Sequence, residues 1–91
     1  MRVVYKYVLK PRKYATVQMP LDSHYLCVAT QVDNGREELC IWADCDPATP
    51  LVDHLFHIYG TGHPIDDVVG PYIGTAHFTT TRLVFHVYRN A

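Results

Sequence analysis

The chain has 91 residues and a formal net charge of −1, and 48% of its residues are hydrophobic against 19% that are charged. This length allows one domain, residues 1–91, and the composition excludes a disordered tail. A near-neutral chain is also not a general binder of the backbone of DNA or RNA.

The positive charge is concentrated at the start of the chain. The first thirteen residues hold five cations and no acid, while the rest hold three cations and nine acids. We therefore expect a cationic first segment on an acidic body, which suits a small anionic partner better than a nucleic-acid polymer. The five cations are Arg2, Lys6, Lys10, Arg12 and Lys13.

The sequence has no apolar run long enough to span a membrane, and cations interrupt the short apolar stretches at its start, which excludes a secretory signal. The three cysteines, Cys27, Cys40 and Cys45, form no CxxC pair. An odd number with this spacing favours free thiols over a disulfide framework or a cysteine-bound zinc. We expect a cytoplasmic protein with no membrane association, no metal and no cofactor.

Alternation of apolar and polar residues recurs along the chain, and helical periodicity is nearly absent. A first strand is predicted over residues 3–9, and Pro11 ends it because proline cannot donate to a ladder. A second, short strand is predicted over residues 14–19 and stops at Pro20. One face of the first strand holds Val3, Tyr5, Tyr7 and Leu9.

The strongest hairpin signal is Asn34-Gly35, because a type I′ turn needs a positive φ at both central positions. The two strands of this hairpin are predicted over residues 24–32 and 37–45. The turn sets the register, so Asp33 is expected to pair with Arg36.

Both faces of this hairpin are apolar, with Cys27 expected opposite Trp42. Such a hairpin is either central in a sandwich, which we favour, or covered by a ligand or a second subunit. One face is predicted to hold Leu26, Val28, Thr30, Leu39 and Ile41, and the other Tyr25, Cys27, Ala29, Cys40 and Trp42.

The second half of the chain continues the strand pattern. A proline-containing loop over residues 46–50 leads to a strand predicted over residues 51–59, in which Phe56 and Ile58 share a face. Residues 60–71 form a long connection rich in glycine and proline, and such loops in small domains tend to be functional or mobile.

A closing hairpin is predicted over residues 72–79 and 82–89, around Thr80-Thr81. Its core face comprises Ala76, Phe78, Leu83, Phe85 and Val87. The elements together predict an all-β fold, a compact antiparallel β-sandwich or partly open barrel of about seven strands.

The histidines offer one candidate for chemistry. His57, His77 and His86 would suit a divalent metal, or a small hydrolase or nuclease, if they approached one another on one face. No carboxylate or cysteine is placed to join them, so ordinary cross-strand contacts are the favoured interpretation. The only serine, Ser23, lacks the glycine elbow of a nucleophile, and we expect no enzyme.

The connection begins with Gly60-Thr61-Gly62-His63, the most informative short motif. Its glycines allow consecutive N–H groups to face an anion, and Thr61 and His63 add side-chain donors. A P-loop is excluded because the lysine and the following helix are missing. A tight turn at the end of a strand is an equal alternative.

If the cationic first strand lies near this motif, the two form a nucleotide-like pocket. Lys6 or Arg2 would then neutralise the phosphate, and Trp42 or Tyr72 would supply a stacking ring. Alone, the stripe of cations is a solvated face or a strand edge protected by lysine.

Seven short segments, in order along almost the whole chain, carry a resemblance to a family of small bacteriophage and prophage proteins. The chain departs from that family at residues 21–24, where a Gly-Ala step is common, and in its content of histidine and cysteine. The matching segments are Val4–Tyr7, Met19-Pro20, Ile41–Ala43, Asp46-Pro47, Gly60–Ile65, Tyr72–Thr75 and Leu83–Tyr88.

The resemblance implies a protein that acts by binding, as small phage proteins do when they sequester cyclic nucleotide signals of bacterial immunity or block a host protein. Our leading hypothesis is a non-enzymatic, homo-oligomeric binder of a small anionic, nucleotide-like ligand. The first alternative is a protein-binding module that inhibits or adapts a host protein through its aromatic face. A weaker alternative is the histidine-based hydrolase or nuclease.

Overall fold

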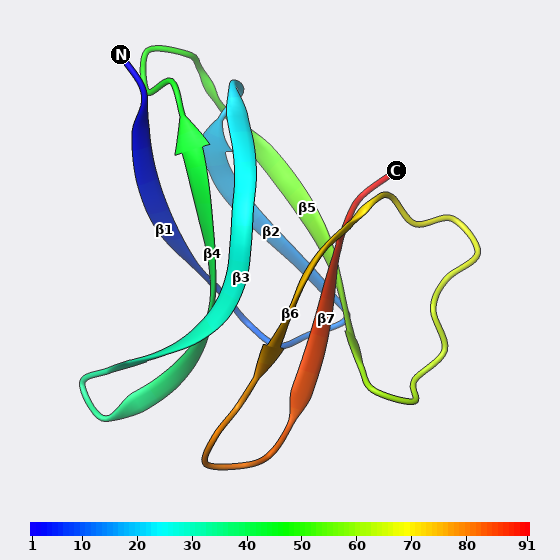
Figure 1. Cartoon of the computed structure of the whole chain (residues 1–91). Helices are drawn as coiled ribbons and strands as arrows, with labels where there is room; N and C mark the ends of the chain where they lie inside the picture. Colours follow the sequence, from blue (N-terminus) through cyan, green and yellow to red (C-terminus); the bar gives the residue numbers. More distant parts are fainter.

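The computed structural model describes residues 1–91 as seven strands without a helix (Figure 1). The predicted all-β class is confirmed, and with no helix present none is available to cross a membrane. The strands are β1 (Val3–Leu9), β2 (Tyr14–Pro20), β3 (Ser23–Asp33), β4 (Arg36–Cys45), β5 (Leu51–Gly60), β6 (Tyr72–His77) and β7 (Val84–Arg89).

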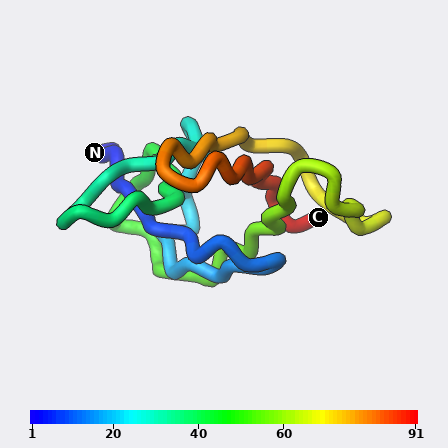
Figure 2. The backbone as a smooth tube through the Cα atoms, turned by 90° about the horizontal axis from the view of Figure 1, so that it is seen from below, coloured from blue at the N-terminus to red at the C-terminus, as the bar shows by residue number.

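The strands form two antiparallel sheets packed face to face. Sheet A has the strand order β1-β4-β3, and sheet B has the order β2-β5-β7-β6. Viewed end-on, the two sheets enclose the core as a flattened ring (Figure 2). The molecule measures 38 × 36 × 16 Å, so the fold is a thin β-sandwich with two broad faces.

The core lies between the sheets and is made by inward-facing side chains of alternating strand positions. Phe56 on β5 and Ile41 on β4 are fully buried at its centre. The other members of this cluster are Leu9, Met19, Val28, Leu39, Ala43, Cys45, Ile58, Ala76 and Val87.

One pair of sheet edges, β3 and β6, is joined by close packing. Gly74 on β6 lies against Val28 on β3, where an added Cβ would approach the Val28 Cβ to 3.1 Å. The Thr30 hydroxyl also donates to the carbonyl of His77 at 3.2 Å. A glycine at position 74 therefore lets the two edges approach closely.

The predicted turn between β3 and β4 is confirmed. Asn34 and Gly35 have φ values of 50° and 75°, as a type I′ turn requires. The register follows from it, with Asp33 opposite Arg36. Further along the hairpin, Cys27 lies opposite Trp42, also as predicted.

A β-bulge at Leu26 corrects the predicted faces of β3. The pairing steps from Tyr25 opposite Ala43 to Cys27 opposite Trp42, which leaves Leu26 without a partner. Leu26 is 54% exposed and does not belong to the core. Tyr25, predicted on the opposite face, instead packs against the core. The extra residue reverses the side-chain alternation on one side of the bulge.

The closing hairpin is shorter than predicted. Strand β6 ends at His77 and β7 begins at Val84, so Leu83 lies in the connection and is 53% exposed rather than in the core. In this connection the carboxylate of Glu37 on β4 accepts hydrogen bonds from the amides and hydroxyls of both Thr79 and Thr80. This carboxylate fixes the turn and ties the two hairpins together.

The long connection, residues 61–71, covers part of the outer face of sheet B. His57 and Tyr59 point to this outer side of β5, yet they are only 6% and 4% exposed. Asp66 of the connection accepts a hydrogen bond from the Tyr59 hydroxyl at 3.1 Å. The connection therefore covers sheet B around His57 and Tyr59, while the outward residues Tyr14, Thr16 and Gln18 of β2 remain exposed. The outer face of sheet A has no segment folded over it (Figure 1).

Replacing Glu37 by Gln is expected to lower the melting temperature at neutral pH. The bonds from Thr79 and Thr80 hold the pKa of Glu37 at about 2, below its ordinary 4.5. Because folding lowers the pKa of Glu37, its ionised carboxylate stabilises the folded state fully above about pH 4.5. This stabilisation is lost as the pH falls toward 2. Thermal melts between these pH values should show a flatter pH dependence for Glu37→Gln.

The matched control is Glu38→Gln, the neighbouring acid, whose carboxylate makes no hydrogen bond to the turn. An equal loss of melting temperature in both variants would contradict the assigned role of Glu37.

Candidate functional site

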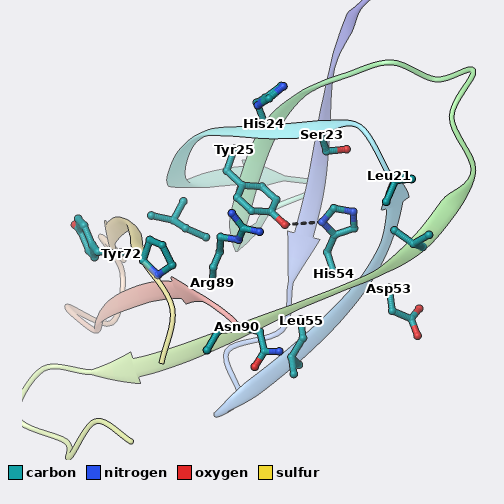
Figure 3. A pocket seen from close by; sticks show the side chains of 14 residues that line it. Leu21, Ser23, His24, Tyr25, Asp53, His54, Leu55, Tyr72, Arg89 and Asn90 are labelled. Atoms are coloured by element: carbon teal, nitrogen blue, oxygen red, sulfur yellow. Dashed lines mark hydrogen bonds between the residues drawn. The ribbon is translucent and has the colours of Figure 1, made fainter. Parts of the chain in front are cut away.

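A pocket of about 650 Å³ opens between the two sheets, where β3 begins and β7 ends (Figure 3). Its wall on sheet A comes from Ser23, His24 and Tyr25. Its wall on sheet B comes from the first half of β5, the end of β7 and the segment that leads into β6. A volume of this size is within the range of pockets for small ligands.

Tyr25 and His54 face each other across the pocket. The Tyr25 hydroxyl is hydrogen-bonded to Nδ1 of His54, and Nε2 of His54 lies 3.1 Å from the carbonyl of Pro20. Because a carbonyl only accepts, Nε2 carries a proton and donates, and in the neutral ring Nδ1 accepts from Tyr25. Burial raises the pKa of the Tyr25 hydroxyl, which keeps it protonated.

Arg89 is the cationic side chain of the pocket, whose lining also includes the acid Asp53. Its guanidinium carbon lies 5.8 Å from the centre of the Tyr25 ring, in a cation–π contact that Figure 3 shows below the ring. No carboxylate in the chain forms an ion pair with it. The guanidinium donors are therefore free for a ligand.

The rim carries further polar groups and one aromatic ring. Asn90 accepts a hydrogen bond from His57 at Oδ1, which fixes its side chain. The Tyr72 ring stands at the mouth, with its hydroxyl 2.6 Å from that of Thr75 and its ring centre 5.5 Å from that of Tyr88. His24, also at the rim, lies 3.3 Å from Asp22.

The cation and the aromatic rings of the pocket are suited to holding a ligand. Both ring nitrogens of His54 have partners within the chain, which fix the orientation of its ring. One unpaired cation beside aromatic rings in a pocket is an arrangement that holds an anion attached to a planar group.

The predicted glycine motif lines a second, smaller pocket of about 400 Å³ at the opposite end of β5. Gly60 and His63 lie in its wall, together with Arg12 and Lys13 from the β1–β2 connection. Arg12 and Lys13, the last two cations of the first thirteen residues, are therefore the ones that lie beside the motif. Neither Arg2 nor Lys6 lines this pocket.

Two donors of the motif, the His63 amide and the Thr61 hydroxyl, have partners within the chain. The His63 amide donates to the Gly60 carbonyl at 3.1 Å, which closes a turn, and Gly62 has a φ of 87° within it. The Thr61 hydroxyl is 2.8 Å from Nε2 of His86. Residues 60–63 therefore form a tight turn, and an anion site on the same residues stays a prediction.

The remaining predicted residues lie apart. Arg2 pairs with Asp22 at 2.8 Å and Asp44 at 2.5 Å, and these carboxylates raise its pKa further. Lys6 and Trp42 are neighbours on the outer face of sheet A. Tyr72 alone of the eight lines the large pocket. The structure does not gather Gly60, Thr61, Gly62, His63, Lys6, Arg2, Trp42 and Tyr72 into one site.

The histidine triad is also not assembled. His57 bonds to Asn90 and Tyr59, and His86 bonds to Thr61 and Thr75, as the favoured interpretation of cross-strand contacts predicted. No three side chains of His, Cys, Asp or Glu are placed to hold a metal ion.

Sequence reasoning missed Tyr25, His54 and Arg89. For Arg89 a signal existed, because the core-facing alternation through Phe85 and Val87 reaches an arginine at its next position. For His54 the alternation through Phe56 leads to it in the same way. A polar residue at a strand position that faces the core either belongs to a functional site or has a hydrogen-bond partner inside the protein. Tyr25 carried no signal, since only the bulge turns it inward.

The connection over sheet B depends on Asp66. Its carboxylate accepts from the hydroxyls of Tyr14 and Tyr59 and pairs with Lys13 at 3.2 Å. Lys13 is the main cause of the lowered pKa of Asp66. Asp66→Asn is expected to loosen residues 61–71, because the amide forms no ion pair with Lys13 and accepts fewer hydrogen bonds.

Limited proteolysis checks this expectation, with faster cleavage in the connection of Asp66→Asn than of the wild type. Asp67→Asn is the control, since Asp67 is exposed and makes no such bonds. Equal cleavage of the two variants would show that Asp66 does not hold the connection.

A family model described as Domain of unknown function (DUF7352) matches residues 1–91. Searches of curated proteins and of solved structures each found no match.

Proposed function

The chain belongs to this family of unknown function, and we propose that its pocket at Arg89 binds a small anionic ligand without catalysing a reaction on it. The single observation that carries the proposal is the Arg89 guanidinium, which faces the pocket with no carboxylate partner. Arg2 is the contrast, because two carboxylates already satisfy it.

The surroundings of Arg89 support a phosphate or carboxylate as the anion. A guanidinium binds both through paired N–H donors, and its contact with the Tyr25 ring holds it in place. Asn90, whose Oδ1 accepts from His57, adds its amide N–H donors to the wall, while the Ser23 hydroxyl donates to the Pro20 carbonyl at 2.6 Å. A charge-assisted hydrogen bond from Arg89 would be stronger than one between neutral groups.

The aromatic residues support a planar group attached to that anion. Tyr25 is half-buried and Tyr72 is exposed at the mouth, so a base-like ring can stack on Tyr72 while its phosphate reaches Arg89. A nucleotide-like ligand combines both features. Sequestration of a cyclic nucleotide signal, which the resemblance to small phage proteins implied, belongs to the same class and is proposed on that basis.

Thermal-shift and calorimetric titrations with AMP, a cyclic dinucleotide, ADP-ribose and inorganic phosphate test this function. At least one should raise the melting temperature, because a ligand that binds only the folded state stabilises it. Arg89→Ala is expected to weaken that binding roughly tenfold to a hundredfold, the usual effect of losing a charge-assisted hydrogen bond. Recovery of the ligand intact would support binding without catalysis, and recovery of a cleaved ligand would contradict it.

Arg12→Ala is the matched control. Arg12 is an exposed arginine that lines the smaller pocket beside Gly60 and His63. Binding that survives Arg89→Ala and is lost in Arg12→Ala would overturn the proposal and place the anion at the glycine motif.

A further inference from the structure

The two sheets have two pairs of strand edges, and only one pair is joined. On one side β6 packs closely against β3, where Gly74 lies against Val28. On the other side β1 and β2 end their sheets, and neither has a further strand hydrogen-bonded to it. Tyr5 shares the inward face of β1 with Leu9, yet Tyr5 is 42% exposed and Leu9 only 1%. The sandwich is therefore open on the side of β1 and β2.

Backbone hydrogen-bonding groups of β2 point out of this open side. The amide of Ile58 on β5 donates to the carbonyl of Lys13 at 2.9 Å, within the register of the two strands. Bonding and non-bonding residues alternate along an antiparallel ladder, so the odd-numbered residues of β2 bond to β5 and the even-numbered ones point away from it. The free edge of sheet B therefore presents the N–H and C=O groups of Tyr14, Thr16 and Gln18.

The two open edges differ in how they are protected against another strand. The edge at β1 carries the cations Arg2, Lys6 and Lys10 at every fourth position, and lysines on an edge strand oppose further pairing. Strand β2 has no such protection. It holds no charged residue, its pairing with β5 contains no bulge, and its only proline is its last residue. An uncharged, regular edge of this kind accepts another strand.

A second copy of β2 fits this edge in an antiparallel register. With Thr16 facing Thr16 on a two-fold axis, Tyr14 of each copy lies opposite Gln18 of the other, and their free N–H and C=O groups meet. Facing threonines are a favourable cross-strand pair. On the inward side Ala15 lies opposite Val17, so no like charges oppose each other on either side. The edge is therefore complementary to itself.

We propose that β2 of one copy pairs with β2 of a second copy, so that sheet B runs continuously through a homodimer. The pairing supplies partners for the free backbone groups of β2 and brings a second strand to the side on which Tyr5 is exposed. None of the residues Tyr14–Met19 lines the Arg89 pocket, so this inference goes beyond ligand binding and does not depend on it.

Sedimentation velocity of the full chain tests the dimer at about 200 µM, where an association of roughly 10 µM affinity is mostly populated. The wild type is expected to have twice the chain mass of 10.4 kDa. Thr16→Lys and Thr16→Glu are each expected to sediment as single chains, because like charges would face each other on the axis. An equimolar mixture of the two variants should dimerise again, since a lysine then faces a glutamate.

The matched control is Val32→Lys, which adds the same charge at a 63% exposed position of β3 in sheet A and should remain dimeric. Far-UV circular dichroism of every variant should match that of the wild type, since Thr16 is exposed.

A monomeric wild type would overturn the proposal and leave the β2 edge to a strand of a different protein. A dimer that both Thr16 variants leave intact would overturn it too. So would a mixture of the two variants that stays monomeric, because Thr16 would then not face itself across the interface.

Discussion

One unpaired residue, Leu26, determines what each face of sheet A presents. Side chains alternate strictly along a strand, so a single inserted residue reverses the alternation on one side of it. On β3 the bulge turns Tyr25 inward with Val28, and it leaves Cys27 outward beside Trp42. The same residue therefore creates the aromatic wall of the Arg89 pocket and completes the apolar outer face.

The sandwich is held together by contacts between hairpins that are far apart in the sequence. Glu37 at the start of β4 binds the turn before β7, and Gly74 on β6 lets that strand approach β3. Asp66 anchors the long connection to sheet B in the same way, through residues of β2 and β5. Because few residues are buried in so thin a molecule, these polar ties matter more here than in a larger core.

The pocket at Arg89 uses one part of this framework. It lies between the sheets, where β3 and the end of β7 diverge, and it combines a cation that has no carboxylate partner with aromatic rings. Tyr25 and Cys27 point to opposite sides of β3, so Tyr25 contributes to the pocket wall while Cys27 faces the outside of sheet A.

The sequence by itself determined the approximate positions of the seven strands and the register of one hairpin, whereas the order of the strands in the two sheets came from the structure. Proline, glycine and Asn34-Gly35 act locally on the backbone, and period-two alternation needs no distant partner to be read. Sequence reasoning missed His54 and Arg89, although the core-facing alternation through Phe56 and Val87 reaches both, because a site at these positions becomes visible only with the pocket around them. Only the tertiary structure decided where the bulge falls, because pairing with Ala43 and Trp42 selects the unpaired residue. It likewise decided that Arg2 is neutralised by distant carboxylates while Arg89 is not, since charge pairing depends on proximity in space rather than along the chain.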